Sequence, residues 1–375
     1  MYLCQLTPLN VLILNKNAKN IALLPLSFLY GTITTVRNWL FDINLLKSTA
    51  FEIPIISIGN LSVGGTGKTP HTEFILSILK YNWKTAVLSR GYKRKTKGFY
   101  LADKNSTAEK LGDESFQIYT KHPKTIVAVD EKRVHGVQNL CSSHPDLQVV
   151  VLDDAFQHRH IHPGLSILLT DYNKLYCRDN MMPLGRLREK QSGSKRASII
   201  VVTKCPDDIR PIDMRLIETE LAIEHKQSLF FSSYRYQEII PVFSKSITKK
   251  RTCLSLQKNK AGILLVAGIV SPQAIVTHLQ NYTENITSLF FPDHHRFKQK
   301  DFNQIIKKLE AIEATEKILL VTEKDAARLI SNPLFPEKLK ARTYALPIKV
   351  EILQNDEDIF TQKIIDYVVE NSRNS

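Results

Sequence analysis

The sequence is poor in cysteine, glycine and proline. Its 375 residues include 5 cysteines, 14 glycines and 16 prolines, and the cysteines are scattered and never spaced as Cys-x-x-Cys. A disulfide framework or a zinc knuckle is therefore not expected, and the pattern is typical of a reducing compartment. Since 43% of the residues are hydrophobic, a disordered or low-complexity chain is excluded. The length allows about two domains.

Acidic residues are also in deficit. The chain has 51 Lys and Arg against 37 Asp and Glu, a formal net charge of +14. This excess predicts an anionic partner, which could be a nucleic acid, an anionic membrane surface or a phosphorylated substrate. The sequence lacks a zinc-finger, RNP or basic-zipper pattern, and aromatic residues are not interleaved in its basic runs. We therefore do not expect a nucleic-acid partner.

Charged residues are absent from positions 20 to 36. This stretch contains Pro25 and Gly31 and is shorter than the about 20 apolar residues that normally cross a bilayer. We expect residues 1–50 to form an N-terminal extension and then a helix over 23–46 that lies in the membrane interface, framed by basic residues. A helix that packs on the domain core is the alternative.

Apolar runs rich in β-branched residues alternate with helical segments over residues 51–227. Continuous apolar runs indicate strands that are buried on both faces, as in a parallel sheet with helices on each side. We therefore predict an α/β fold with a doubly wound, mainly parallel sheet. The predicted strands are 54–58, 85–88, 125–129, 148–152, 165–169 and 198–202.

The pattern changes at residue 228. Residues 228–260 begin with short, aromatic, extended sequence and end in a basic run without acidic residues, and we expect them to form an extended β linker. Strand and helix patterns then resume, so residues 261–375 are predicted to form a second, smaller α/β domain. Its expected strands are 263–269, 286–291 and 318–322, and its expected helices are 272–280 and 300–311.

The most specific local pattern is GNLSVGGTGKTP at residues 59–70, which follows an apolar strand and opens a helix. Glycines let successive backbone N–H groups point at a phosphate, and the helix adds its positive end. Lys68 is expected to reach the β- and γ-phosphates, and the Thr69 hydroxyl to bind Mg²⁺. Ser62 replaces the first glycine of the strict pattern. The loop predicts a P-loop NTPase-like core with these nucleotide-binding residues: Ser62, Val63, Gly64, Gly65, Thr66, Gly67, Lys68 and Thr69.

An acidic pair ends the predicted strand 148–152. Such a strand delivers Asp153 and Asp154 to the carboxyl edge of the sheet, where ligands of these folds bind, so both are Mg²⁺ candidates. The histidines that follow alternate in a turn-like segment, which does not favour a transition-metal site. We instead expect Gln157 and His158 at the edge of the nucleotide.

Further phrases follow in a fixed order: LSRGY at 88–92, GDE at 112–114, DDAFQH at 153–158, PLGRLRE at 183–189, FPDH at 291–294 and VTEKDA at 321–326. With the glycine-rich loop, this series closely resembles the tetraacyldisaccharide 4′-kinase family, whose substrate is a tetra-acylated glucosamine disaccharide 1-phosphate of the lipid A pathway. The resemblance implies ATP and Mg²⁺ as cofactors and two α/β/α domains joined by a two-stranded linker. It also implies a peripheral or monotopic position on the cytoplasmic face of the bacterial inner membrane.

The resemblance assigns roles to matching positions. It implies that Asp113 is the catalytic base, that His294 pairs with it across the domain cleft, and that Arg133 helps to neutralise charge. It further places Glu189 near the metal, and Arg90 and Tyr92 near the substrate. The excess positive charge is then best interpreted as attraction to anionic lipid headgroups and to a phosphorylated glycolipid. We expect a monomer.

Alternatives remain at this stage. The GDE phrase could be a helix cap, and residues 322–325 are expected to close the sheet or hinge of the second domain, with no chemistry assigned to Arg328. A switch-type P-loop ATPase of the partition or metallochaperone kind also has a loop of the form GGxGKT. Such loops usually carry a lysine just before the two glycines, where this chain has Val63.

Overall fold

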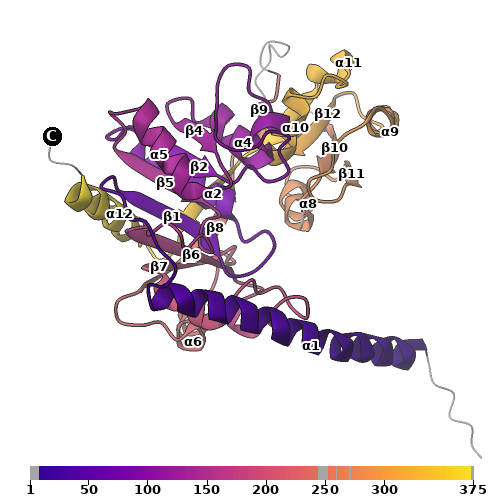
Figure 1. Cartoon of the computed structure of the whole chain (residues 1–375). Helices are drawn as coiled ribbons and strands as arrows, with labels where there is room; N and C mark the ends of the chain where they lie inside the picture. Colours follow the sequence, from indigo (N-terminus) through magenta and orange to yellow (C-terminus); the bar gives the residue numbers. More distant parts are fainter. Residues whose placement is uncertain (1–7, 244–251, 259, 270–271, 373–375) are drawn as a thin grey trace, which may run out of the picture.

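The protein consists of two sheets, each covered by helices, and a long N-terminal helix (Figure 1). The structure, a computed structural model, describes residues 8–372 apart from 244–251, 259 and 270–271, with side chains from residue 23 onward. Most of the basic run predicted in the linker, including residues 245 and 249–251, lies outside the described residues, as do residues 1–7 of the N-terminal extension.

The large sheet has nine strands in the order β14-β8-β7-β6-β1-β5-β2-β4-β3. All neighbouring pairs are parallel except those that involve the edge strands β3 and β14. Each predicted strand of the core is present, because its apolar residues are buried on both faces. The strands are β1 (Ile55–Asn60), β2 (Thr85–Ser89), β3 (Tyr100–Leu101), β4 (Ile126–Val129), β5 (Val149–Asp153), β6 (Leu165–Asp171), β7 (Ile199–Thr203), β8 (Ser228–Tyr236) and β14 (Ile348–Ile352).

Helices cover both faces of the large sheet. One face packs against α2 (Lys68–Leu79), α4 (Asp113–Lys121) and α12 (Glu357–Asn371). The other packs against α5 (Arg133–Ser143) and α6 (Pro211–Leu221). The predicted doubly wound α/β fold is therefore confirmed. Shorter segments are α3 (Ala108–Leu111) and the 3₁₀ turns η1 (Tyr176–Arg178) and η2 (Gln191–Arg196).

The small sheet has five strands in the order β11-β10-β12-β13-β9. Its strands are β9 (Ile240–Pro241), β10 (Gly262–Ala267), β11 (Ile286–Phe290), β12 (Lys317–Thr322) and β13 (Thr343–Leu346). One face packs against α9 (Gln299–Glu310), α10 (Glu323–Ile330) and α11 (Glu337–Lys340). The other packs against α7 (Cys253–Lys258) and α8 (Gln273–Gln280).

The domain boundaries differ from the prediction at two places. Residues 228–236, predicted as linker, form β8 and pair with β7 inside the large sheet. The C-terminal part of the predicted second domain, 261–375, belongs to the large sheet instead. Strand β14 pairs antiparallel with β8, and α12 buries Phe360, Ile364 and Val368 in the core of that sheet. The reason is that β8 leaves a strand edge, which β14 pairs with, and an apolar side chain, Phe230, on which Phe360 of α12 packs.

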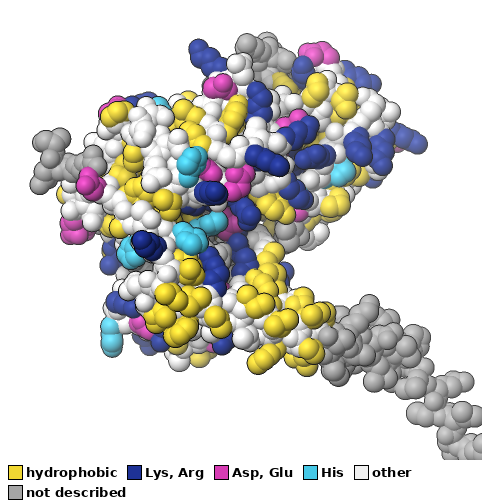
Figure 2. Space-filling model, in the orientation of Figure 1, with side chains coloured by type: hydrophobic (Ala, Val, Ile, Leu, Met, Phe, Trp, Pro, Cys, Tyr) yellow, Lys and Arg dark blue, Asp and Glu magenta, His cyan; other side chains and the backbone are white. Residues whose placement is uncertain are grey.

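The N-terminal helix α1 (Pro8–Asp42) is 35 residues long and starts and ends earlier than the predicted 23–46. Its polar side chains bond to loops at one end of the large sheet: the Ser27 hydroxyl donates to the Met181 carbonyl at 2.8 Å, and the Tyr30 hydroxyl to the Arg188 carbonyl at 3.0 Å. Its opposite side exposes hydrophobic side chains (Figure 2), among them Phe28 at 78%. No helix in the described part of the chain is long and apolar enough to span a bilayer.

Candidate active site

The glycine-rich loop joins β1 to α2 at the carboxyl edge of the large sheet. Gly64 and Gly67 have φ angles of 119° and 89°, which residues with a side chain rarely adopt. Gly67 is the N-cap of α2, so the first-turn N–H groups, including those of Lys68 and Thr69, have no partner within the helix. The loop is therefore shaped to hold an anion with its backbone amides and the positive end of the helix.

Neighbouring strands brace this loop. The Asn60 side-chain amide donates to the Thr66 hydroxyl at 2.7 Å, and the Thr203 hydroxyl donates to the Thr66 carbonyl at 2.8 Å. The Lys204 ammonium donates to the Gly65 carbonyl. Sequence reasoning missed these three bracing residues, although each stands at the carboxyl end of an apolar strand, where such contacts are made.

Ser62 and Val63 belong to the outer wall of the loop. Ser62 is buried and forms a bridge with Leu187, and the Val63 N–H donates to the Arg186 carbonyl at 2.7 Å. The segment that contains the PLGRLRE phrase is thus fixed directly to the phosphate loop.

Asp153 ends β5 and is fully buried. Its Oδ1 accepts a hydrogen bond from the Thr72 hydroxyl at 3.1 Å, whereas its Oδ2 has no partner among the described residues. Burial, with the charges of Glu114 and Asp154, raises the pKa of Asp153 to about 6. An unpaired buried carboxylate oxygen is costly unless a cation or a water binds it, so this oxygen is a candidate metal ligand.

Asp154 adopts a left-handed conformation, with φ of 47°, and turns its carboxylate toward two cations. Its Oδ1 lies 3.7 Å from Lys68 Nζ and 3.0 Å from Arg188 Nη2. Burial alone would raise the pKa of Asp154, but these two charges outweigh it and hold the pKa below its ordinary value. Lys68 and Asp154, predicted separately as a phosphate-binding and a metal-binding residue, therefore lie side by side, and both roles stay predictions.

Positive charge gathers beside the acidic pair. Arg133 is buried at the start of α5 and donates from Nη2 to the Asp153 carbonyl at 3.3 Å, while its Nε has no partner among the described residues. Burial and the neighbouring charge of Arg90 lower the pKa of Arg133 to about 10. Burial, Arg133 and Arg90 also lower the pKa of His158 to about 4, so His158 is neutral at physiological pH. These side chains fit the oxygens of a phosphate group.

Gln157 and Glu189 connect the phosphate loop to α1. The Gln157 amide donates to the Asn60 carbonyl at 2.7 Å and to Glu189 Oε1 at 3.0 Å. Glu189 Oε2 accepts from Asn38 of α1 at 2.8 Å and from Arg196 at 2.7 Å. Both oxygens of Glu189 are therefore engaged, and its predicted place near the metal stays a prediction.

Asp113 and His294 belong to the domains of different sheets, and their side chains are in contact. Asp113 is the first residue of α4, and His294, with φ of 60°, lies in the loop after β11. Asp113 Oδ2 is 3.1 Å from His294 Nδ1, and the exposed Tyr92 ring lies edge-on to the His294 ring with centroids 5.2 Å apart. Burial alone would raise the pKa of Asp113, but the hydrogen bond with His294 and the charge of Arg328 hold it below its usual value.

Helix α10 supplies two cations, one near its start and one in its last turn, that the sequence reasoning did not place at the site. Arg328 Nε donates to Asp113 Oδ2 at 2.8 Å. Lys324 Nζ lies 3.1 Å from Glu114 Oε1 and 3.4 Å from His294 Nε2. The VTEKDA phrase was the only available signal, and it did not reveal the contact because Arg328 and Asp113 are 215 residues apart.

The donor set fits a divalent cation that is bound together with a phosphate. No group of three or more His, Cys, Asp or Glu side chains in the described structure could hold a metal by itself. Mg²⁺ is commonly bound by one or two carboxylates together with substrate phosphates. Asp153 Oδ2, which has no partner among the described residues, and the Thr69 hydroxyl on the first turn of α2 match that mode.

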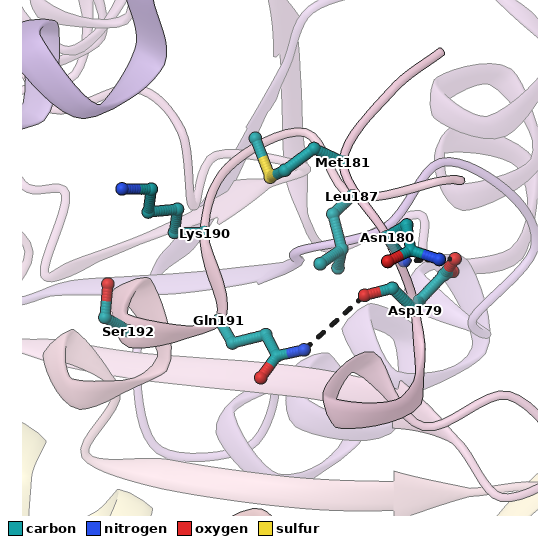
Figure 3. A pocket seen from close by; sticks show the side chains of 7 residues that line it. All are labelled: Asp179, Asn180, Met181, Leu187, Lys190, Gln191 and Ser192. Atoms are coloured by element: carbon teal, nitrogen blue, oxygen red, sulfur yellow. Dashed lines mark hydrogen bonds between the residues drawn. The ribbon is translucent and has the colours of Figure 1, made fainter. Parts of the chain in front are cut away.

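Two cavities lie away from these residues. One, of about 370 Å³ (Figure 3), lies in the segment between α1 and the phosphate loop and is lined by Asp179, Asn180, Met181, Leu187, Lys190, Gln191 and Ser192. The other, of about 420 Å³, is lined by Ala50, Phe51, Glu52, Ile53, Gln138, Cys141 and Ser142. Neither is lined by a predicted site residue.

Comparison with known proteins identifies the family. Residues 19–368 match the LpxK family model, described as tetraacyldisaccharide-1-P 4'-kinase. The chain is 51% identical over 359 residues to a tetraacyldisaccharide 4'-kinase of Bacteroides thetaiotaomicron, with 94% of each chain covered. It is 43% identical to that of Flavobacterium johnsoniae, with 93% of this chain and 97% of the relative covered.

A solved structure agrees. The crystal structure of LpxK from Aquifex aeolicus in complex with ATP superposes with a TM-score of 0.70 at 26% identity, covering 93% of this chain and 99% of that chain. The match includes the two-sheet fold and does not favour a switch-type ATPase. The chain therefore belongs to the LpxK family of tetraacyldisaccharide-1-phosphate 4'-kinases, the kinases of lipid A biosynthesis.

Proposed function

We propose that this protein uses ATP and Mg²⁺ to phosphorylate the 4′-hydroxyl of a tetra-acylated glucosamine disaccharide 1-phosphate. The observation that carries the proposal is that a phosphate loop on the large sheet accompanies a carboxylate, Asp113, paired at 3.1 Å with His294 from the small sheet. A kinase needs a group beside the acceptor hydroxyl that accepts its proton, and a carboxylate held at the edge of a second domain suits a large acceptor.

The nucleotide side uses the residues around the loop. The amides of the glycine-rich turn and of the first turn of α2, within residues 64–69, and the Lys68 ammonium would hold the phosphates, with Ser62 and Val63 shaping the loop behind them and Gln157 and His158 at the nucleotide edge. Thr69 and Asp153 would hold Mg²⁺, supported by Asp154 and Glu189, and the bound ion would neutralise charge on the phosphate oxygens. Arg133 adds positive charge there, because its buried guanidinium has an unpaired Nε.

The acceptor side uses Asp113. A sugar hydroxyl is a poor nucleophile, so its proton must move to a base as the oxygen forms a bond to the γ-phosphorus and the bond to the β-phosphate oxygen breaks. The pKa of Asp113 is held below its usual value, by His294 and Arg328 against burial, so its carboxylate is ionised and can take the proton. Tyr92 and Arg90 lie on exposed loop positions nearby, where a sugar or its phosphate would be bound.

The glycolipid and the membrane account for α1 and for the net charge. The exposed hydrophobic side of α1 is suited to lie in the headgroup region of an anionic membrane, on the cytoplasmic face of the inner membrane. Lys and Arg side chains also gather on the lobe that carries the small sheet (Figure 2), which suits a phosphorylated lipid.

The direct test is phosphate transfer from labelled ATP, with Mg²⁺, to lipid A disaccharide 1-phosphate in detergent. We expect transfer by the wild type and its loss in Lys68→Ala, while Lys95→Ala, which changes an exposed lysine paired with Glu109, retains it. No transfer by a wild type that binds ATP would overturn the proposal. ATP hydrolysis without transfer would favour a switch-type ATPase.

A further inference from the structure

The start of α10 is fixed to the carboxyl edge of the small sheet. Asp325 is fully buried, and its Oδ2 accepts from the Thr322 hydroxyl at 2.7 Å and from the Gly268 N–H at 2.9 Å. The Asp325 N–H donates to the Thr322 hydroxyl at 3.1 Å. A buried carboxylate with this many donors has one defined position, so Asp325 is a rigid anchor.

Arg328 extends from this anchor to the other domain. Its Nη1 donates to Asp325 Oδ1 at 2.7 Å and to the Gly268 carbonyl at 3.2 Å, and its Nε donates to Asp113 Oδ2 at 2.8 Å. The side chain is only 6% exposed. A guanidinium presents its donors in a fixed planar fork, so holding one end sets the position of the other. The Asp113 carboxylate is thus oriented from the small sheet.

Lys324 lies one helical turn before Arg328 and acts on His294. Its Nζ is 3.4 Å from His294 Nε2 and also contacts Glu114 and Asp293 at 3.1 and 3.2 Å. Asp293 Oδ2 lies farther from Nε2, at 3.6 Å. An ammonium only donates, so a hydrogen bond from Lys324 uses an unprotonated Nε2 and places the ring proton on Nδ1, facing Asp113. Lys324 therefore favours the tautomer that hydrogen-bonds the carboxylate.

Among the described residues, the ion pairs that surround Asp113 and His294 involve three elements. Asp113 and Glu114 lie on α4, Asp293 and His294 follow β11, and Lys324, Asp325 and Arg328 lie on α10. The permanent cations of this cluster both belong to α10. The charge of the cluster and the geometry of the Asp113–His294 pair thus depend on one helix, α10, whose first residues belong to the VTEKDA phrase.

We propose that Arg328 and Lys324 are positioning residues for the proton-accepting pair: Arg328 fixes the Asp113 carboxylate, and Lys324 fixes the His294 tautomer. Packing of α10 on α4 would then complete the acceptor side of the site. This inference rests on the proposed function for its activity assay, and on a spectroscopic measurement that does not need that function.

The activity test compares Arg328→Gln and Arg328→Lys with the wild type in the transfer assay. For Arg328→Gln we expect kcat about 10- to 100-fold lower, less than the about 10²- to 10⁴-fold for loss of a base, with KM for ATP unchanged. The acid limb of the kcat/KM profile should move to higher pH, because Asp113 loses a cation that favours its ionised form. Arg328→Lys keeps the charge and should retain the wild-type limb with a smaller loss of kcat. Arg342→Gln, which removes an exposed ion pair with Glu310, is the control.

A mutant cycle separates positioning from general stability. In an Asp113→Asn background, Arg328→Gln should cost little further activity, since the carboxylate it positions is gone. A full additional loss there, or wild-type kcat and pH limb in Arg328→Gln, would overturn the proposal. Should Arg328→Gln not fold, Arg328→Lys decides, because an unchanged kcat in that variant contradicts a role for the guanidinium fork.

The measurement independent of activity is ¹⁵N NMR of His294 in the full chain. We expect the Nδ1–H tautomer in the wild type and a shift toward Nε2–H in Lys324→Gln. An unchanged tautomer in Lys324→Gln would refute the assignment even in an inactive preparation. Absence of transfer by the wild type, with the expected NMR result, would instead refute the proposed function alone.

Discussion

At the scale of single residues, the acceptor side depends on one carboxylate oxygen. Asp113 Oδ2 lies 3.1 Å from His294 Nδ1 and accepts a hydrogen bond from Arg328 Nε at 2.8 Å, and both partners belong to the domain of the small sheet. Since both of these donors use Oδ2, neither of them occupies the other oxygen, which can accept a proton. Removing either the carboxylate or the imidazole should therefore disable the same step.

We predict that Asp113→Asn and His294→Gln each lower kcat by about 10²- to 10⁴-fold while ATP binding persists. Because both act on one proton transfer, the double variant should be little worse than the poorer single variant. Steady-state transfer kinetics and ATP titration measure this. Glu109→Gln, an exposed carboxylate on α3, is the control. Losses that multiply in the double variant would show independent roles.

A second residue-scale prediction concerns His71, which is buried on α2 behind the phosphate loop. Its Nδ1 lies 2.8 Å from the Gly67 carbonyl and its Nε2 3.0 Å from the Ser232 hydroxyl. Burial lowers the pKa of His71 to about 4, against 6.5 unfolded. The unfolded chain thus binds the proton first, and folding stability falls as pH drops from about 6.5 toward 4.

From these pKa values, His71 removes roughly 2 kcal/mol of stability between pH 7 and pH 5. His71→Gln, which can keep both hydrogen bonds without titrating, should lose less stability over that interval. Urea unfolding at the two pH values gives the measurement. His162→Gln, an exposed histidine, should behave as the wild type. Parallel pH dependences for wild type and His71→Gln would refute the assignment.

At the scale of elements, α1 combines a bonded side and an exposed apolar side. Asn38 bonds to Glu189, and Tyr30 to the Arg188 carbonyl, so the helix is part of the nucleotide-side wall. Phe28 and Trp39 are exposed on it at 78% and 55%. Substitutions on the exposed side should therefore weaken membrane binding without lowering transfer activity in detergent, because we expect only that side to contact the membrane.

We predict that Phe28→Ser combined with Trp39→Ser weakens binding to anionic phospholipid vesicles by tenfold or more. The reason is that each large apolar side chain contributes about 1.5–3 kcal/mol when it leaves water. Cosedimentation gives the binding, and the detergent transfer assay should stay near wild type. Ile359→Ser, which changes an exposed apolar side chain on the outer side of α12, is the matched control. Equal binding by the double variant and wild type would contradict a membrane role for α1.

The sequence predicted where helices and strands lie along the chain better than it predicted which of them pair or pack together. The core strands and the phosphate loop were predictable, because continuous apolar runs and a glycine-rich turn are local signals. The place of β14 was not, although Ile348, Val350 and Ile352 alternate with polar residues. Its partner β8 is more than 100 residues away, and a pattern of alternation does not say which edge it will cover. The contact between Arg328 and Asp113 was hidden for the same reason.

At the scale of the whole molecule, the chain crosses between the sheets and returns. It leaves the large sheet after β8, builds the small sheet, and comes back as β14 and α12. The Tyr367 hydroxyl on α12 bonds to both the N–H and the carbonyl of Ile55 at 3.0 Å, at the start of β1. The C-terminal helix therefore holds the strand that leads into the phosphate loop.

Phe360 tests this return of the chain. It is 1% exposed and packs on Phe74 of α2 and Phe230 of β8, with ring centroids 5.6 and 5.1 Å apart. We predict that Phe360→Ala lowers the free energy of unfolding by about 3–5 kcal/mol and speeds hydrogen exchange in β1 and α2. Phe335→Ala, in the core of the small sheet, should instead speed exchange in β10 and β12. Since residue 360 follows the small sheet in sequence, a chain that folded as two consecutive domains would show the Phe360 effect in β10 and β12. That outcome would refute the architecture in which the C-terminus supports the nucleotide side.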